Sequence, residues 1–399
     1  MRVVALTAGV LVWTLVLAAC GSSGSKNGEP SGDPANVDRD QIPSVAATWE
    51  TDWARRSIDL SELVVGLPGR IDSRDGIPPI DKPTFEAVAA ASQWLEDREP
   101  IVLLEIAGAA RAYPLRILTQ HEIVNDQLSN VPVAITYCPL CNSAVAFDRR
   151  VNGKTLRFGV SGLLRHSDLV MWDDASVSLW QQITGEALVG ELTGTQLKLI
   201  AAPIVRWSQF RDSFPEGEVL SRDTGFGHSY GANPYDGYDS SSRPFLFNGK
   251  LDDRYPAMER VVGVTVKRAA KAYPFSVLGD ERVVNDEVGG EAIVVFWGAA
   301  DTASALDHSE VAGGRGVGVG VAYFRRLADR TLTFQLYAGD EVRDEETGST
   351  WNLLGQAVAG PLAGETLTPV VHTNHLWFAW AAFNPDAPVY EGTPRPSSR

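Results

Sequence analysis

Short apolar segments separated by polar turns dominate the chain, and this pattern is typical of β-strands. Ile101–Ile106 and Arg111–Leu115 predict a hairpin around Gly108. Asn152-Gly153 lies between two such segments and is a strong hairpin signal, because both residue types tolerate positive φ. The other predicted strands are Val133–Tyr137, Ala144–Arg149, Thr155–Val160, Leu169–Trp172 and Val177–Trp180.

Helical patterns are scarcer than strand patterns. The longest is Pro83–Leu95, for which Asp81 is a candidate N-cap. Shorter helical turns are predicted at Trp207–Phe214 and Trp377–Phe383, each followed closely by a proline. We therefore expect an α+β, β-rich fold with few short helices.

Two parts of the chain resemble each other. Residues 101–128 align with residues 261–288 at a constant separation of 160 residues, and ten positions are identical. Ala112-Tyr113-Pro114, for example, aligns with Ala272-Tyr273-Pro274. We expect two tandem copies of a related strand-rich domain that pack together.

Changes in composition along the chain predict its domain organisation. The predicted parts are a lipoprotein signal peptide at 1–19, a flexible tether at 20–45, an N-terminal extension with one helix at 46–98, a first copy at 99–220, a connecting loop at 221–255, a second copy at 256–391 and a tail at 392–399. The connecting loop is rich in Gly, Pro and Tyr, and loops of this length are often functional.

Charge and cysteine content exclude several classes of protein. The net charge of -15 over 399 residues offers no basic face to neutralise phosphates, so we expect no nucleic-acid partner. Three cysteines are too few for a scaffold built on disulfides, so the core must hold itself together.

The N-terminus predicts export and attachment to a membrane. Arg2 precedes an apolar run, Val3–Leu17, which is too short to be a comfortable membrane-spanning helix. Small residues then lead into Cys20, and this arrangement resembles the lipobox of bacterial lipoproteins. We expect Cys20 to be lipidated, with the chain anchored on the extracytoplasmic side of a bacterial membrane, in the cell envelope.

Only the first copy contains a pair of cysteines, in Cys138-Pro139-Leu140-Cys141. Gly298 and Asp301 occupy the aligned positions of the second copy, and Glu281 aligns with His121. Because the second copy is expected to fold without cysteines, a purely architectural role for the pair is less attractive.

A Cys-x-x-Cys pair in an oxidising compartment can exchange between dithiol and disulfide. In this interpretation the protein is a thiol-disulfide oxidoreductase, with Cys138 as the attacking thiol, Cys141 as the resolving thiol and His121 as a thiolate stabiliser or proton donor. Its partner would be a thiol or disulfide protein or a small molecule. Arg111 and Arg116 are further candidates to stabilise a thiolate.

Two alternatives remain open at this point. The cysteine pair could join His372 and His375 of the second copy in a four-ligand zinc or copper centre for metal binding or delivery, although the sequence requires no cofactor. The protein could also be a non-enzymatic binding module of the cell envelope that presents loop 221–255 to a ligand. Acidic clusters such as Asp173-Asp174 and Asp344-Glu345-Glu346 are interpreted as solvated turns.

A series of longer motifs resembles the DUF3179 family of exported prokaryotic proteins. These motifs are Asp75-Gly76-Ile77-Pro78, Ala112-Tyr113-Pro114, His121–Asp126, Thr136–Cys141, Ser178-Leu179-Trp180, Asp223–Phe226 and Met258–Gly263. The resemblance covers about residues 50–391 and implies no established activity. Selenoprotein relatives within the family favour redox chemistry, if selenocysteine replaces a cysteine of this motif.

Overall fold

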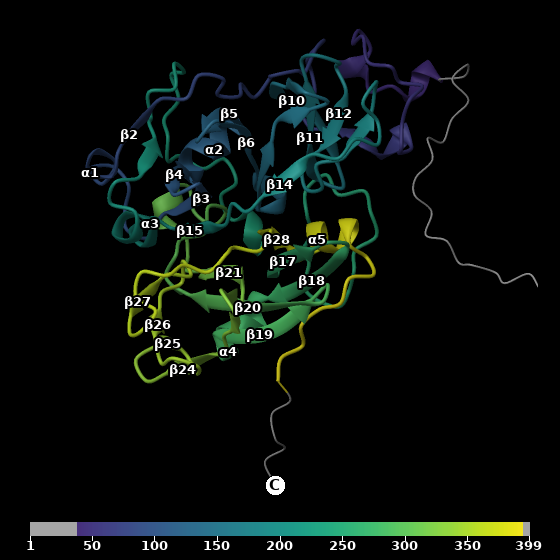
Figure 1. Cartoon of the computed structure of the whole chain (residues 1–399). Helices are drawn as coiled ribbons and strands as arrows, with labels where there is room; N and C mark the ends of the chain where they lie inside the picture. Colours follow the sequence, from purple (N-terminus) through teal and green to yellow (C-terminus); the bar gives the residue numbers. More distant parts are fainter. Residues whose placement is uncertain (1–37, 394–399) are drawn as a thin grey trace, which may run out of the picture.

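A computed structural model describes residues 38–393 of the chain. Strands account for 39% of the structure and helices for 14%, so the expectation of a β-rich fold is confirmed. Figure 1 shows the elements up to β16 in the upper part of the molecule and those from β17 onward in the lower part. The predicted signal peptide and Cys20 lie outside the described residues.

The upper part contains three antiparallel or mixed sheets and a small hairpin. The first sheet has the order β15 (Ile204–Arg206), β3 (Pro100–Ile106), β4 (Ala109–Pro114), β16 (Glu218–Leu220), β2 (Phe85–Ala87). The second has the order β14 (Lys198–Ile200), β7 (Ser143–Asp148), β6 (Val131–Cys138), β5 (Ile123–Leu128). The third has the order β1 (Leu63–Val65), β10 (Phe158–Arg165), β11 (Asp168–Asp173), β12 (Leu179–Gln181), β13 (Ala187–Val189). The hairpin joins β8 (Arg150–Val151) and β9 (Lys154–Thr155).

The lower part also contains three sheets and a small hairpin, and its sheets have fewer strands. One sheet has the order β18 (Ala269–Pro274), β17 (Arg260–Val266), β28 (His372–Leu376). Another has the order β19 (Val283–Val288), β20 (Glu291–Gly298), β21 (Val319–Phe324). The third has the order β24 (Phe334–Tyr337), β25 (Glu341–Asp344), β26 (Thr350–Trp351), β27 (Ala357–Ala359), and β22 (Arg326–Leu327) pairs with β23 (Arg330–Thr331).

Five short helices accompany the sheets in the described part of the chain. They are α1 (Val88–Ala91), α2 (Leu115–His121), α3 (Trp207–Ser213), α4 (Phe275–Glu281) and α5 (Trp377–Phe383). The predictions at Trp207–Phe214 and Trp377–Phe383 are confirmed by α3 and α5. Sequence analysis did not identify α2 and α4, which begin directly after a proline.

One succession of elements occurs twice in the chain. The strands and helix from β3 to β6 (Pro100–Cys138) recur from β17 to β20 (Arg260–Gly298), each beginning and ending 160 residues later. The pairing also recurs, since β3 pairs with β4 and β15, and β17 pairs with β18 and β28. Residues 99–220, which include the first of these stretches, and residues 256–391, which include the second, are called here the first and second segments.

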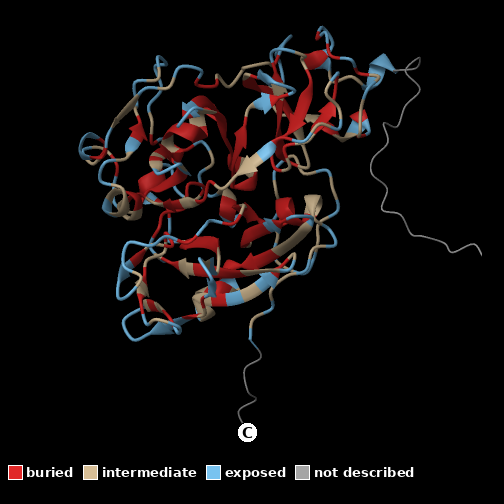
Figure 2. Cartoon of the chain, in the orientation of Figure 1, coloured by how far each residue is buried: buried red, intermediate tan, exposed pale blue. Residues whose placement is uncertain are grey.

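The two segments share one apolar interior, as the buried strands in Figure 2 indicate. One cluster of buried side chains contains Ile101 and Trp207 of the first segment and Phe296 and Val321 of the second. The segments are also joined by hydrogen bonds, among them one from the Ile204 N–H to Asn374 Oδ1 at 3.3 Å. Burial of apolar surface at this junction, at roughly 25 cal/mol per Å², favours a fixed arrangement of the segments.

The predicted helix Pro83–Leu95 is wrong over most of its length. Phe85–Ala87 form β2, which pairs with β16, and only Val88–Ala91 are helical. Asp81 does not cap a helix; it accepts hydrogen bonds from Arg157 and from Asn125. Strand pairing with a distant part of the chain therefore overrides the local helical pattern.

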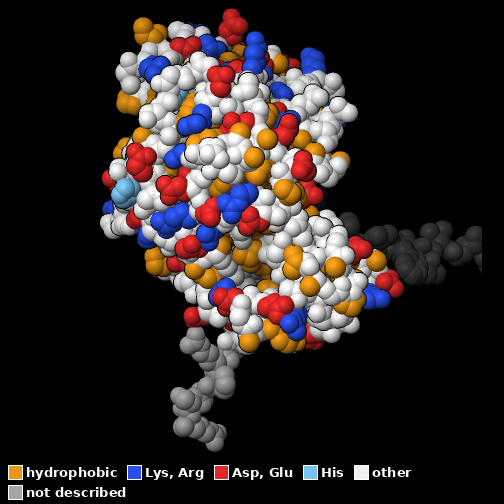
Figure 3. Space-filling model, turned by 90° about the vertical axis from the view of Figure 1, so that its left-hand side faces the viewer, with side chains coloured by type: hydrophobic (Ala, Val, Ile, Leu, Met, Phe, Trp, Pro, Cys, Tyr) orange, Lys and Arg blue, Asp and Glu red, His pale blue; other side chains and the backbone are white. Residues whose placement is uncertain are grey.

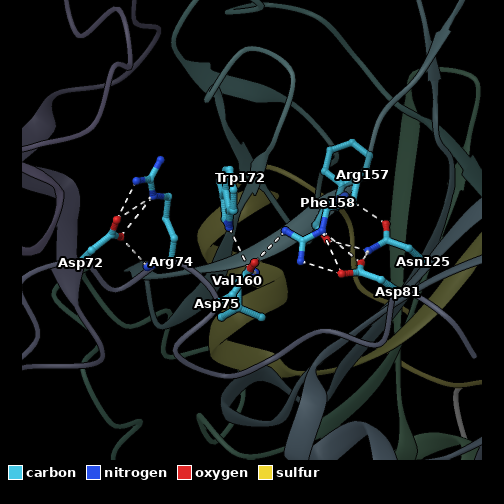
Figure 4. A network of polar contacts seen from close by, with 9 residues as sticks. All are labelled: Asp72, Arg74, Asp75, Asp81, Asn125, Arg157, Phe158, Val160 and Trp172. Carbon is cyan, nitrogen blue, oxygen red and sulfur yellow. Dashed lines mark hydrogen bonds and ion pairs between the residues drawn. The ribbon is translucent and has the colours of Figure 1, made fainter. Parts of the chain in front are cut away.

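Asp75 links the N-terminal extension to β10 and β11 of the third sheet in the upper part, as Figure 4 shows. Its Oδ1 accepts hydrogen bonds from the Val160 N–H at 3.1 Å and from Trp172 Nε1 at 3.0 Å, and Arg157 forms an ion pair with Oδ2. Gly159 is required for this approach, because a Cβ there would lie 2.2 Å from Asp75 Oδ1. The contact fixes the position of the following residues, Ile77 and Pro78.

Acidic and basic side chains are interspersed on the face drawn in Figure 3, so this face has no large region of one charge. No helix between residues 38 and 393 has the length and apolar character needed to cross a membrane.

The two segments provide a matched test of a buried polar contact. Asn125 bonds both the N–H and the C=O of Phe158, and Asn285 bonds both groups of Phe334 in the same way. Asn125 is buried, whereas Asn285 is exposed. We expect Asn125→Ala to lower the free energy of unfolding by about 2–3 kcal/mol, because it leaves buried backbone groups without partners.

Asn285→Ala is the control and should cost less than about 1 kcal/mol, because water replaces the lost contacts. Urea denaturation followed by tryptophan fluorescence measures both values. Equal losses of unfolding free energy in the two variants would contradict the importance of burial for the Asn125 contact.

Candidate functional site

The Cys-Pro-Leu-Cys motif forms the turn between two central strands. Cys138 is the last residue of β6, Pro139–Cys141 form one 3-10 turn, and β7 begins at Ser143. Pro139 suits the first position of the turn because its fixed φ is helical, and Asn142 closes the turn at a φ of 49°. The turn therefore holds both cysteines on one side of a short, rigid connection.

The two sulfur atoms lie together without a bond between them. They are 3.8 Å apart, and both thiols are free. Each donates a hydrogen bond to the Ser167 carbonyl, at 3.7 Å from Cys138 and 3.4 Å from Cys141. The exposed fraction is 2% for Cys138 and 0% for Cys141, so neither thiol is open to bulk solvent.

Asp168 is brought to the thiols by the hairpin of β10 and β11. A carboxylate oxygen of Asp168 and the two sulfur atoms all lie within 4.8 Å of one another. Asp168 Oδ2 accepts hydrogen bonds from Gln181 Nε2 at 2.6 Å and from the Ile183 N–H at 3.0 Å. Oδ1 is buried without a nitrogen or oxygen donor, so it is the oxygen left to face the thiols.

Glu122 adds a second carboxyl to this region. It follows α2 at a φ of 58° and is 8% exposed. We call Cys138, Cys141, Asp168 and Glu122 the thiol–carboxyl cluster. Neither carboxyl was singled out by sequence analysis, although the alignment places Glu122 opposite Arg282 and so marks a change in charge between the segments.

Burial makes every member of the thiol–carboxyl cluster a weaker acid. It raises the pKa of Asp168 to about 7, against hydrogen bonds from Gln181 and Ile183 that lower it. Burial and the nearby Asp168 raise the pKa of Glu122 to about 8. The pKa of Cys141 is raised well above that of an ordinary thiol by burial and by Cys138. Both thiols and Glu122 therefore favour their protonated forms near neutral pH, whereas Asp168 titrates in that range.

The two thiols are nevertheless not equivalent. Burial raises the pKa of Cys138 as well, but Cys141 is able to turn its S–H from the Ser167 carbonyl to a Cys138 thiolate, and this hydrogen bond lowers the pKa of Cys138 and partly offsets the burial. The same bond raises the pKa of Cys141. Cys138 is therefore the more acidic of the two thiols.

His121 lies against the connecting loop. Its Nδ1 contacts the Pro78 carbonyl and its Nε2 contacts the Tyr230 hydroxyl, both at 2.6 Å. Phe226 and His228 pack against the same ring at centroid distances of 5.1 Å. Both ring nitrogens are thus engaged away from the sulfur atoms, and burial lowers the pKa of His121.

The arginines proposed as thiolate stabilisers are paired with other carboxylates. Arg111 forms ion pairs with Asp126 and Glu218, and Arg116 forms one with Glu99. The ionisable side chain close to both sulfur atoms is instead an acid, Asp168.

His372 and His375 are both buried on β28. His372 Nδ1 contacts the Val370 carbonyl at 2.8 Å, and its Nε2 accepts from the Ala322 N–H at 3.3 Å. His375 bonds Thr373 and stacks against Trp380. Within residues 38–393, the group of three or more close metal-ligand side chains consists of Cys138, Cys141 and Asp168, so the histidine pair is not part of it.

A cavity of about 640 Å³ adjoins the thiol–carboxyl cluster. Glu122, Leu140 and Leu169 line its inner side. Residues 234–246 of the connecting loop supply half of its lining, and we call them the covering segment. The Tyr238 hydroxyl donates a hydrogen bond to the Leu140 carbonyl at 3.0 Å, which ties the covering segment to the cysteine turn.

The second segment has no equivalent of this site. Gly298 ends β20 where Cys138 ends β6, and a Cβ at Gly298 would lie 2.7 Å from a methyl carbon of Leu353. The hairpin that carries Asp168 is also shorter there. Phe158 pairs with Asp173, fifteen residues later, whereas Phe334 pairs with Asp344, ten residues later.

Two acidic residues interpreted as solvated turns are buried instead. Asp173 and Asp344 are 0% and 1% exposed. Each accepts a hydrogen bond at 2.9 Å from an indole N–H seven residues later, Trp180 Nε1 and Trp351 Nε1. They hold their hairpins together rather than forming part of the site.

Comparison with known proteins gives one match. A family model described as "Protein of unknown function (DUF3179)" matches residues 74–387. No curated protein and no solved structure matches the chain.

Glu122 gives stability a measurable pH dependence. Its folded-state pKa, about 8, is above the ordinary value of 4.5, so the folded state holds a proton that the unfolded state has lost between these pH values. Its stabilising contribution is complete below pH 4.5 and is lost as the pH rises to about 8. We expect a slope of up to about 1.4 kcal/mol per pH unit from this one proton.

Glu122→Gln should remove that part of the slope and stabilise the protein at pH 7. The exposed Glu216→Gln is the control and should leave the slope as it is. Urea denaturation between pH 5 and pH 8 measures the slope. If the stability of Glu122→Gln changed with pH as steeply as that of the wild type, the raised pKa of Glu122 would be contradicted.

Proposed function

We propose a thiol-disulfide redox function for this chain, which belongs to the DUF3179 family of proteins of unknown function. The observation that carries the proposal is a free, close pair of sulfur atoms beside a buried acid. Cys138 and Cys141 are 3.8 Å apart, and Asp168 lies within 4.8 Å of both. A disulfide bond of about 2.05 Å requires the sulfur atoms to approach by less than about 2 Å, which a small rotation of two side chains supplies.

The carboxyl groups answer the main chemical difficulty of buried thiols. Burial suppresses the thiolate, which is the reactive form in disulfide exchange. Asp168, with a pKa of about 7, is ionised in part at neutral pH and is able to take the proton of Cys141. A proton acceptor whose pKa is near the working pH is the most effective kind.

The proposed roles follow from the inequality of the thiols. Cys138 ionises first and attacks, and Cys141 resolves the mixed disulfide after giving its proton to Asp168. His121 is a positioning residue in this proposal. Its contacts with the Pro78 carbonyl and the Tyr230 hydroxyl fix the position of the following residue, Glu122.

The second segment supports a functional rather than an architectural role for the cysteines. Its β19 and β20 pair in the same register as β5 and β6, although the turn after β20 carries Gly298 and Asp301. The strands therefore form without sulfur. We propose that a duplication produced the two segments and that only the first kept a reactive site.

The proposed location follows from the sequence. A lipidated Cys20 would hold the protein at the extracytoplasmic side of a bacterial membrane, in the cell envelope, where a cysteine pair is able to oxidise. Palmitate labelling of the wild type and of Cys20→Ser, expressed in a bacterium, measures the anchor.

Redox titration tests the proposed chemistry. We expect the pair to interconvert between dithiol and disulfide in glutathione buffers, with free thiols trapped by alkylation and counted by mass spectrometry. Cys138→Ser and Cys141→Ser should remain reduced at the other cysteine. Asp168→Asn should slow disulfide formation at pH 7 by about tenfold or more, because it removes the proton acceptor.

Glu105→Gln is the matched control for the loss of a carboxyl. Burial raises the pKa of Glu105 too, but this residue is on β3 and lines a different cavity, so the rate should not change. A pair that stays reduced in strongly oxidising buffer, in protein with native circular dichroism, would sink the redox proposal.

Metal binding is a second candidate function, favoured by the same geometry. Two Zn–S bonds of about 2.3 Å at a tetrahedral angle place the sulfur atoms roughly 3.8 Å apart. The observed separation is 3.8 Å, and Asp168 would be the third ligand. Zn²⁺ or Cu⁺ would also offset the cost of burying several acidic groups together.

Metal uptake by the reduced protein tests this candidate. Titration with Zn²⁺ and with Cu⁺ against a chromophoric chelator should show one equivalent bound, and Asp168→Asn should weaken the affinity by about tenfold or more. Bound metal should also block disulfide formation. Less than a tenth of an equivalent bound by wild-type protein would eliminate the metal candidate and leave the redox proposal standing.

A further inference from the structure

The approach to Cys138 is restricted by the segments that surround it. Both thiols are buried, and the Ser167 carbonyl occupies their hydrogen-bonding side. Disulfide exchange requires the attacking sulfur to reach its target in line with the bond that breaks, so a disulfide on the surface of a folded protein cannot reach Cys138 in this arrangement. A reactant has to enter the molecule.

The cavity of about 640 Å³ lies beside this buried pair. It has the size of a site for a small molecule, since such sites are commonly ~300–1,000 Å³. Leu140, between the two cysteines, and Leu169, next to Asp168, both belong to its lining. A molecule in the cavity therefore contacts one member of the thiol–carboxyl cluster, Glu122, and lies next to the sequence neighbours of Cys141 and Asp168.

The cavity wall selects against negative charge. Its lining is mainly aliphatic and aromatic, with Tyr235, Tyr238 and Phe245 contributed by the covering segment. The charged residue types among the lining are Glu122, Asp236 and Arg243, of which Asp236 and Arg243 are exposed and Glu122 is buried. Because the pKa of Glu122 is about 8, its carboxyl is mostly protonated at pH 7 and offers no cation to a ligand. An anionic ligand would therefore lose its hydration inside the cavity without a buried positive charge in return.

The covering segment is held unevenly, which indicates how the cavity opens. Its first half is fixed by Asp239, which accepts hydrogen bonds from Arg260 at 2.8 Å and from Arg315 at 2.6 Å. Its second half is more exposed and forms no such ion pairs with the described part of the chain. The Phe245 carbonyl accepts a hydrogen bond from Ser167 Oγ at 2.5 Å, and the Phe245 N–H donates one to the Tyr238 hydroxyl at 3.3 Å. Leu246 has a φ of 53°, an uncommon conformation for a leucine.

We propose that the cavity admits a small, uncharged disulfide past the second half of the covering segment and presents it to Cys138. This inference rests on the redox function proposed above and names the substrate class of that site. Displacement of residues 243–246 breaks the bond to Ser167 Oγ, frees the end of the cavity and loosens Tyr238 above the Leu140 carbonyl.

The reaction balances in two exchange steps. Cys138, as a thiolate, forms a bond to one sulfur of the substrate while the substrate disulfide breaks, and the leaving sulfur takes up the proton that Cys138 lost. Cys141 then gives its proton to Asp168 and bonds to Cys138 Sγ, so the second sulfur leaves and takes that proton. The substrate is reduced to two thiols, and the protein is oxidised by two electrons to the Cys138–Cys141 disulfide.

Two chromogenic disulfides, one uncharged and one anionic, test the proposal in a single turnover. The probes are uncharged 4,4′-dithiodipyridine and dianionic 5,5′-dithiobis(2-nitrobenzoate), mixed with the reduced full-length protein at pH 7. The rate for each probe is divided by its rate with the same protein in denaturant, which removes intrinsic reactivity. We expect this ratio to be at least about tenfold larger for the uncharged probe, the factor that 1.4 kcal/mol of charge discrimination produces.

Variants of the covering segment and the cavity locate the effect. Ser167→Ala should accelerate the reaction with the uncharged probe several-fold, because it releases residues 243–246. Leu164→Trp should slow it by a similar factor, because Leu164 lines the cavity. Tyr337→Ala is the control: Tyr337 is an exposed aromatic residue on β24 that does not line the cavity, and the rate should be unchanged.

The outcomes separate this inference from the function on which it rests. Equal ratios for the two probes, or a larger ratio for the dianion, would overturn the substrate class while the glutathione titration still reports a redox-active pair. Insensitivity to both Ser167→Ala and Leu164→Trp would overturn the route through the cavity. A pair that forms no disulfide in glutathione buffers removes the redox function itself.

Discussion

Desolvation of acidic groups governs the site described here. Two thiols and two carboxyls share a region from which water is largely excluded, and each charged form is disfavoured there. At neutral pH both thiols and Glu122 are therefore protonated and Asp168 is ionised only in part, which limits the charge that is buried without a cationic partner. Any process that takes protons from the thiols has to give them to a neighbour, and Asp168 is the neighbour in contact with both sulfur atoms.

Local patterns in the sequence predicted the parts of the fold that local chemistry determines. The Asn152-Gly153 turn was predicted from residues that tolerate positive φ, and both adopt it, with φ of 50° and 78°. Phe85–Ala87 was misassigned to a helix because its partner, β16, is more than 130 residues away in the chain. No local pattern contains that pairing, and a strand at the edge of a sheet takes its conformation from its partner.

The site was predictable only in part, for the same reason. The cysteine pair is contiguous, so its turn and its closeness were accessible from the sequence. Asp168 comes to it from a separate hairpin, and an aspartate in Ser167-Asp168 carries no mark of its own. The available signal came from comparing the two segments. The hairpin from Phe158 to Asp173 is five residues longer than the equivalent hairpin from Phe334 to Asp344. Asp168 lies within the longer hairpin.

His121 shows how neighbouring residues in one motif separate in space. His121 and Glu122 are consecutive, but the positive φ of Glu122 turns the chain at the end of α2. His121 consequently contacts the connecting loop through Tyr230, while the carboxyl of Glu122 lines the cavity. The connecting loop thus contacts His121 through Tyr230 and the cysteine turn through Tyr238. In the proposed reaction, displacement of the covering segment alters the walls of the cavity while the strands that fix the two cysteines stay in place.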